Sequence, residues 1–263
     1  RSSAASDVYK RQAMGVTVGG VARVSRALGA GDPREARRMA AASLVLMALA
    51  MAVSAALYLA AIGPFTQAIG LAPDVRARLL SYVAITAPFA TVMGLGMMLS
   101  NLLRAAGHGR QSMWVLLAGT ATVAVLDPLV IFVLDGGMVG VAWAGGIGRV
   151  ATLVLGGWLV FGKHRLVARP ERARLGADLA AVGRIALPAG LSALATPAAV
   201  IFTASTYAGF GSSVMAGATV VDRVLQLSYS MFFVLPGAIG PILGQNLGCL
   251  LYTSPSPRDK RQS

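Results

Sequence analysis

The stretch Val24–Arg38, VSRALGAGDPREARR, decides the fold because a shorter copy of its centre returns near the other end of the chain. Ala27-Leu28-Gly29 corresponds to Asn246-Leu247-Gly248 in the string GQNLG, an offset of 248 − 29 = 219 residues. Each copy stands where a long apolar segment ends. Internal repeats of this kind are typical of secondary transporters, so the repeat predicts a membrane protein made of two related halves.

The composition of the chain independently indicates an integral membrane protein. Hydrophobic residues make up 56% and charged residues only 13% of the 263 residues, and the mean hydropathy is +0.69. Soluble domains carry about 25% charged residues. The apolar residues are also gathered into runs longer than the roughly 18 residues that suggest a membrane span.

The two ends of the chain have a separate origin in our interpretation. Asp7–Gln12 and Cys249–Ser254 translate opposite strands of the DNA element AGATGTGTATAAGAGACAG, which resembles a transposase adapter of sequencing libraries. We therefore expect residues 1–12 and 249–263 to be adapter-derived rather than natural disordered tails. They should make few contacts and carry no continuous helix leading out of the fold. The chain between them is then a piece of a longer protein.

Setting these ends aside removes two classes of function. The single cysteine, Cys249, goes with them, so no disulfide or thiol chemistry is expected. The net charge falls from +13 to +9, and the remaining charge has a membrane explanation, so we expect no nucleic-acid partner.

Six long apolar segments follow a short apolar stub at 13–22, and they predict an all-α, polytopic membrane helix bundle. About 20 helical residues cross the hydrocarbon core at 1.5 Å per residue, and all six are long enough. Their predicted ranges are 40–63, 79–103, 112–134, 138–162, 184–207 and 212–243.

The loops between these segments differ sharply in their arginine and lysine content. One set of loops holds 13 basic residues and the opposite set holds only Arg76 and Arg78. Because basic loops stay on the cytoplasmic side, the richer set should face the cytoplasm. Within it, Leu175, Leu179 and Val182 have helical spacing, which fits either a short helix lying on the membrane surface or an ordinary polar loop.

Local signals place several helix ends. Asp32 and Pro33, with Glu35 at the third helical position, predict an N-cap followed by a helix start. Gly29 and Gly31 just before them supply the turn that ends the preceding helix. The segment Asp135-Gly136-Gly137 is short enough to join two helices in a close hairpin.

Several motifs, in this order and spacing, resemble the multidrug and toxic compound extrusion (MATE) transporters. They are VSRALGAGDPREARR, SNLLRAAGHGRQ (100–111), LDPLVIF (126–132), ALPAGLSAL (186–194) and PILGQNLG (241–248). The resemblance covers residues 13–248 and implies a partial two-lobe transporter fold with an inverted or other pseudo-repeat. It implies a first lobe at 13–162 with helices two to six, a cytoplasmic linker at 163–183, and the start of a second lobe at 184–248.

The family resemblance also implies a function. MATE proteins export amphipathic, often cationic drugs by alternating access, coupled to protons or sodium ions and without another cofactor. The expected setting is the bacterial cytoplasmic membrane, with the lipid bilayer and drug-like molecules as partners and a monomeric transporter. The alternative is a flippase for lipid-linked oligosaccharides of the same superfamily. A membrane-embedded enzyme is disfavoured because the sequence lacks H-E-x-x-H and G-x-S-x-G motifs, and His108 and His164 lie in basic loops.

Asp127 is the candidate coupling residue. It stands inside an apolar segment, where a carboxylate is costly and usually marks an ion or proton route. The alternative is an acid near the outer surface that is wetted from outside. Pro128 removes a backbone donor beside it and can leave a carbonyl free to join the site. The resemblance implies that an acid here belongs to the cation-coupling network of the first lobe.

Other candidate residues complete this interpretation. Asn101 is a candidate polar neighbour of Asp127, and Arg149, one helix further on, is its candidate charge partner. Two positions where the family often has Asn and Thr hold Val123 and Gly145 instead. Finally, Pro188 and Pro197 are expected to kink the first helix of the second lobe.

Overall fold

The computed structural model describes residues 3–68, 73–134 and 136–249, and within them it shows only helices and their connections. The predicted all-α class is confirmed. The helices are α1 (Ser3–Gly29), α2 (Pro33–Ala68), α3 (Pro73–Ala105), α4 (Gly109–Phe132), α5 (Gly137–Gly157), the π-helical turn η1 (Trp158–Lys163), α6 (Arg172–Ala208) and α7 (Ser212–Gly248).

Five of the six predicted apolar segments lie within helical structure, the fourth covering α5 and η1 together, and the third extends two residues past the end of α4. Among the described residues, four stretches are long and apolar enough to cross a membrane, namely Pro33–Gln67, Pro73–Ala105, Gly109–Phe132 and Val139–Lys163. Large apolar side chains also cover the outside of the bundle: Phe132 is 84% exposed and Val125 is 69% exposed. Such a surface is suited to lipid rather than to water.

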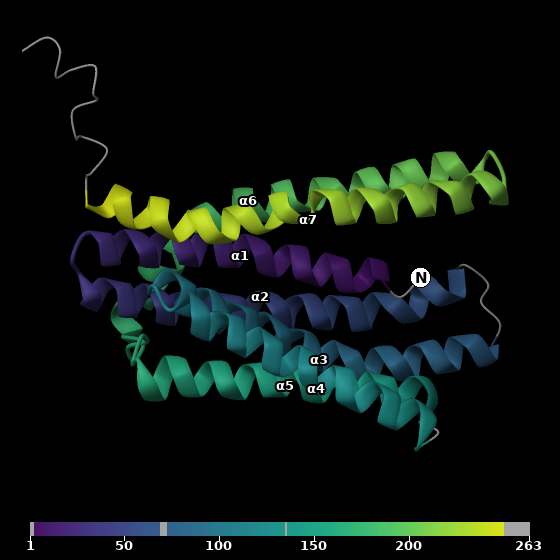
Figure 1. Cartoon of the computed structure of the whole chain (residues 1–263), viewed down its shortest axis with the longest axis horizontal. Helices are drawn as coiled ribbons and strands as arrows, with labels where there is room; N and C mark the ends of the chain where they lie inside the picture. Colours follow the sequence, from purple (N-terminus) through teal and green to yellow (C-terminus); the bar gives the residue numbers. More distant parts are fainter. Residues whose placement is uncertain (1–2, 69–72, 135, 250–263) are drawn as a thin grey trace, which may run out of the picture.

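Helix α1 lies at the centre of the arrangement. It packs against α2, α3, α6 and α7, and Figure 1 shows it between the α6–α7 hairpin and the layers formed by α2–α5. Small residues allow this close approach. A Cβ atom at Gly15 would lie 2.6 Å from Cα of Gly190, and one at Gly19 would lie 2.8 Å from the carbonyl oxygen of Val182.

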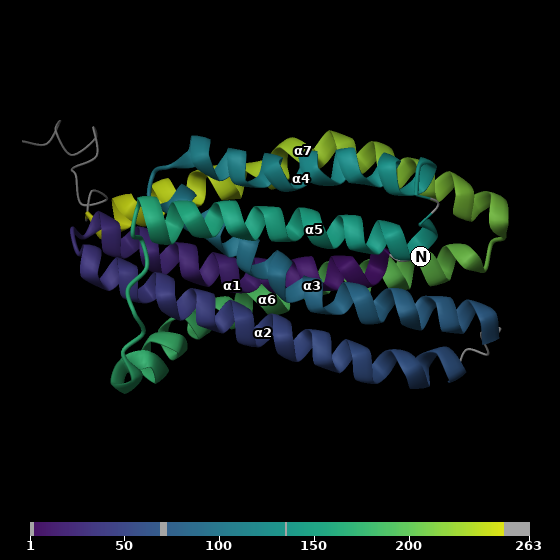
Figure 2. The ribbon, with the colours of Figure 1, turned by 90° about the horizontal axis from the view of Figure 1, so that it is seen from below.

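The bundle has two chemically different ends. The α1–α2, α3–α4 and α5–α6 connections gather at one end, which we call the basic end, and the remaining connections gather at the opposite end (Figures 1 and 2). Helices α1 and α7 both end at the basic end and therefore run in the same direction. The 219-residue repeat is thus a parallel repeat rather than an inverted one.

The local signals at the start of α2 are confirmed. Asp32 Oδ1 accepts a hydrogen bond of 2.9 Å from the backbone nitrogen of Glu35, and α2 begins at Pro33. Gly31, in the turn before it, has a φ of +74°, which favours glycine. The hairpin between α4 and α5 is also short, and Gly137 has a φ of +52°.

The segment 172–183 is neither the short surface helix nor the polar loop that the sequence allows. Helix α6 begins at Arg172 and continues without interruption into the apolar segment, so residues 172–183 form neither a separate surface helix nor a loop. Val182 is completely buried, and Leu179 packs against the same core cluster as α1 and α2. The apolar spacing of this segment therefore serves packing inside the protein.

The expectation for the N-terminal residues is wrong in one respect. Helix α1 begins at Ser3, so Ser3–Gln12 form a helix continuous with the rest of α1. Extending an existing helix avoids the cost of a new nucleus, which lets a sequence without strong helix breakers continue it. At the other end, Cys249 is exposed, and residues 250–263 lie outside the described residues. The adapter origin of these ends stays a prediction.

Candidate functional site

Asp127 lies in the part of α4 near the opposite end of the bundle. It comes 18 positions after Gly109 and five before Phe132, the first and last residues of α4. At 1.5 Å per residue, this is about 27 Å from the basic end of the helix and about 8 Å from its other end. The side chain is half-buried, and its buried Oδ1 atom has no hydrogen-bond partner among the described residues.

An unpartnered carboxylate oxygen is chemically informative. Burial of such an atom without a hydrogen bond costs free energy, and most buried polar atoms in proteins are therefore paired. A proton or a small cation would satisfy this oxygen. The arrangement therefore fits a group that binds and releases a cation.

The packing of α4 against α5 fixes the direction in which Asp127 faces. A Cβ atom at Gly148 of α5 would overlap the side chain of Val123, and one at Gly119 of α4 would overlap the side chain of Thr152. Gly119, Val123 and Asp127 are spaced four residues apart, so they share one face of α4. Asp127 therefore lies on the face of α4 that packs against α5.

Gly145 of α5 lies at the same level as Asp127. It precedes Gly148 by one turn, just as Asp127 follows Val123 by one turn in the antiparallel helix. A Cβ atom built on Gly145 would meet no atom within 4 Å. Gly145, which aligns with a position where the family often has a threonine, therefore has room beside it for a side chain.

The structure does not bring Asn101 to Asp127. Asn101 comes four positions before the end of α3 at the basic end, or about 6 Å along the axis. Asp127 lies about 27 Å from the same end, so some 20 Å of depth separate the two residues. Asn101 Nδ2 instead donates a 2.8 Å hydrogen bond to the carbonyl oxygen of Met97 in its own helix.

Arg149 is half-buried in α5, next to Gly148. The ion pairs between described residues do not include one between Arg149 and Asp127. The predicted pairing of Arg149 with Asp127 is therefore not formed among the described residues.

The three candidate prolines all lie inside helices. Pro128 is inside α4, where it cannot donate to the carbonyl group of Ala124. Pro188 and Pro197 are inside α6, which is helical through both positions. The side chain of Pro197 lies outside the described residues, and the predicted kinks stay predictions.

Sequence reasoning missed the polar contacts at the basic end. Arg38 pairs with the buried Asp178 at 3.0 Å and thus ties the start of α2 to the start of α6. His108 and His164 stack with their ring centroids 3.9 Å apart, and His164 Nε2 lies 2.5 Å from Gln111 Oε1. These partners are far apart in the sequence, and no spacing rule links them.

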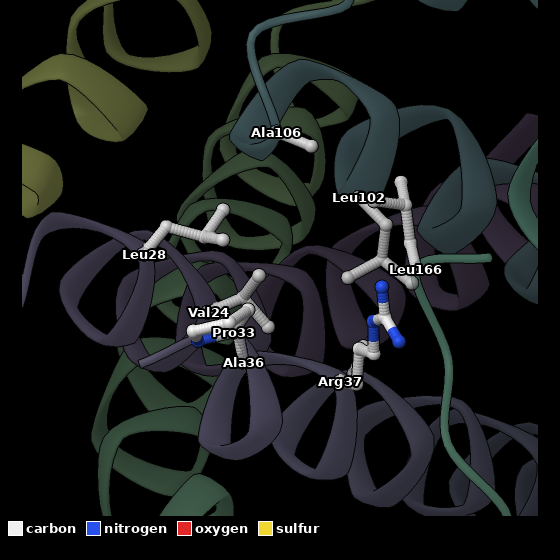
Figure 3. Close-up of a pocket in the computed structure, with 9 residues that line it drawn as sticks. Val24, Leu28, Pro33, Ala36, Arg37, Leu102, Ala106 and Leu166 are labelled. Carbon is white, nitrogen blue, oxygen red and sulfur yellow. The ribbon is translucent and has the colours of Figure 1, made fainter. Parts of the chain in front are cut away.

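One cavity, of about 100 Å³, lies at the basic end between α1, α2, α3 and Leu166 (Figure 3). Apolar side chains line most of it, and the side chain of Arg37 extends toward Leu166 at its edge. Sites for drug-sized molecules measure about 300–1,000 Å³. This cavity is therefore too small for such a substrate, and it contains no residue of α4 or α5.

Comparison with known proteins places the fold. A mutant of the MATE transporter VcmN from Vibrio cholerae superposes with a TM-score of 0.87 at 22% identity, covering 94% of this chain and 56% of that chain. The family model MatE matches residues 6–129, which include seven of the twelve residues of the N-terminal segment 1–12. The MatE model thus matches just under half of the chain, and the fold of the whole described chain is that of a MATE transporter. MATE proteins are multi-pass membrane transporters and not enzymes, as the sequence predicts.

Two curated relatives extend this comparison. The FAD transporter of Shewanella oneidensis is 25% identical over 242 residues, which are 90% of this chain and 54% of the relative. An uncharacterized 21 kDa protein of Pseudomonas savastanoi is 39% identical over 104 residues, or 40% of this chain and 34% of the relative. The chain thus spans about half, or less, of the curated relatives that it matches.

Proposed function

We propose that this chain forms part of a cation-coupled MATE antiporter that exports amphipathic, often cationic molecules by alternating access. The observation that carries the proposal is the buried, unpartnered Oδ1 atom of Asp127 inside a membrane-spanning helix. A proton or a sodium ion is the coupling cation, and no other cofactor takes part. The transporter acts as a monomer in the bacterial cytoplasmic membrane.

The orientation of the bundle follows from its charge. The basic end carries most of the arginine residues of the connections, so it faces the cytoplasm and the opposite end faces outward. Cysteines at Gly109 and Arg169 should resist membrane-impermeant thiol reagents in intact cells, while one at Gly136 should react. Labelling of the first two from outside would reverse the orientation.

The function is tested with the full-length transporter in bacterial cells. Expression should lower the accumulation of cationic dyes in the cells. Dissipation of the proton or sodium gradient should raise dye accumulation back to the level of cells without the transporter. Separate ionophores for protons and for sodium ions distinguish the two coupling ions. Dye accumulation that is equal with and without the transporter would contradict the proposal.

The FAD transporter among the relatives favours a second candidate substrate. FAD is an anionic amphipathic molecule, so export of a flavin nucleotide would replace export of cationic dyes. Measurement of FAD in the medium of the same cells decides between them. Movement of a lipid-linked sugar, with neither dye nor FAD exported, would instead favour the flippase.

A further inference from the structure

The two copies of the sequence repeat meet each other in the structure. Helix α1 ends at Gly29 and α7 ends at Gly248, and both ends lie side by side at the basic end (Figure 1). α1 and α7 are in contact, and the 219-residue offset relates one to the other. The contact therefore joins equivalent parts of the two lobes.

This contact is reciprocal. A Cβ atom at Gly29 would overlap the carbonyl oxygen of Gln245, and a Cβ atom at Gly248 would overlap the carbonyl oxygen of Arg26. Gln245 precedes Gly248 by three residues, and Arg26 precedes Gly29 by three residues. The same contact thus occurs twice with the helices exchanged, as at the interface of a two-fold symmetric dimer.

A third pair lies at the centre of this crossing. Ser25 and Gly244 are related by the same offset, and a Cβ atom at Gly244 would lie 2.6 Å from the Cβ atom of Ser25. Ser25 is completely buried. The pseudo-two-fold axis therefore passes between these residues, and the crossing has no room for an additional methyl group at any of its three glycines.

Two hydrogen bonds from side chains hold the crossing closed from one side. Gln245 Nε2 donates to the carbonyl oxygen of Ala105 at 2.9 Å, and Arg104 donates to the carbonyl oxygen of Gly237 at 3.4 Å. Both bonds join the end of α3 in the first lobe to α7 in the second. They are separate from the glycine contacts and add no bulk to the crossing.

We propose that the crossing of the two repeat copies is the seal that closes the basic end, and that alternating access requires Gly29 and Gly248 to separate. This inference rests on the proposed transport cycle but makes a structural claim of its own. In the conformation described here the seal is closed, because backbone meets backbone without intervening side chains. Methyl groups at the two glycines should push the helices apart and favour the state that is open at this end.

The test measures the distance across the seal in the full-length transporter reconstituted in lipid. Spin labels are placed on the exposed positions of Arg34→Cys in α2 and Leu243→Cys in α7, in a background without other cysteines. Gly29→Ala and Gly248→Ala should each shift the distance distribution toward a longer population. Because the contact is reciprocal, the two shifts should be similar, and the double variant should shift further.

The matched control is Gly240→Ala, since a Cβ atom at this glycine of α7 would meet no atom within 4 Å. It should keep the wild-type distribution. Gln245→Ala removes a hydrogen bond without adding bulk and should cause a smaller shift in the same direction, which covers the case in which the glycine variants fail to fold.

Distances in folded Gly29→Ala and Gly248→Ala that match those of Gly240→Ala would overturn the seal. So would an unchanged distribution in Gln245→Ala if the glycine variants do not fold. The readout requires no transport. A distance shift without any export would contradict the proposed substrates and still support the seal. Export by the transporter without a distance shift in the glycine variants would support the substrates and contradict the seal.

Discussion

The two ends of the bundle use polar groups in opposite ways. At the basic end, polar side chains connect helices: Arg38 pairs with Asp178, and Gln245 reaches Ala105. Toward the opposite end, Asp127 keeps a buried oxygen atom without a partner among the described residues. Buried atoms of Arg23, Ser25 and Arg38 at the basic end also lack a hydrogen bond, but both arginines are in ion pairs. Asp127 has no ion pair among the described residues, so its carboxylate is left available for a cation.

The largest effect expected from this comparison is at Asp127. Asp127→Asn keeps the volume of the side chain but cannot exchange a proton or attract a cation, so gradient-driven efflux should fall to the level of cells without the transporter. Asp127→Glu keeps the charge and should retain part of the efflux. Dye accumulation and the amount of protein in the membrane are measured together.

Asp74→Asn is the matched control for this variant. Asp74 is an exposed acid in the first turn of α3, at the same end of the bundle, and its replacement should leave efflux unchanged. Normal efflux by well-expressed Asp127→Asn would show that Asp127 is a wetted surface acid like Asp74, and the contrast between the two ends would disappear.

The next largest effect concerns the ion pair at the basic end. Arg38→Ala leaves the carboxylate of Asp178, whose side chain is only 9% exposed, without its partner. The free energy of unfolding should fall by about 2 kcal/mol, less than for a fully buried pair because Arg38 is partly hydrated. Denaturant unfolding in detergent measures the change. Arg174→Ala is the control, since its pair with Glu171 is about two-thirds exposed and should contribute about 0.5 kcal/mol or less.

A smaller effect is expected at the cap of α2. Asp32→Ala removes the acceptor for the backbone nitrogen of Glu35 and should cost about 1 kcal/mol, while Asp32→Asn should keep most of the stability. The same unfolding measurement applies. Equal loss in both variants would mean that the charge of Asp32, and not its hydrogen bond, stabilises the end of the helix.

The sequence predicts the helices well because each depends on neighbouring residues. The apolar runs, the Asp32 cap and the turn at Gly31 are local signals, and the structure contains each of them. The segment 172–183 shows the limit of such reasoning. Its apolar spacing is visible in the sequence, but whether that face meets lipid or protein depends on α1 and α2, which lie far away in the chain.

The candidate site shows the same limit more sharply. An isolated acid in an apolar run is visible in the sequence, so Asp127 stands out. Which residues surround Asp127 depends on their position along the bundle axis in the neighbouring helices. Asn101 is about 20 Å away from Asp127 along this axis, so the two side chains do not meet. The sequence repeat gave the one long-range signal, since Gly29 and Gly248 share both a motif and a contact.

The smallest effect expected is a pH dependence at the basic end, where His108 and His164 form a stacked pair. Burial, followed by the positive charges that His108 and Lys163 can place nearby, lowers the pKa of His164 below its ordinary value. The folded state therefore disfavours the proton, so the stacked contact is fully stable above about pH 6.5 and loses stability as the pH falls through the lowered pKa.

A histidine-selective NMR titration of the full-length transporter measures this directly, with the His164 signal assigned by its loss in His164→Gln. In His108→Gln, removal of the stacked ring should raise the pKa of His164 toward its ordinary value and weaken the pH dependence. Lys163→Gln should raise the pKa less, since Lys163 contributes the smallest of the three causes. An identical titration in all three proteins would mean that the His164 ring does not sense His108 or Lys163, and that burial alone lowers its pKa.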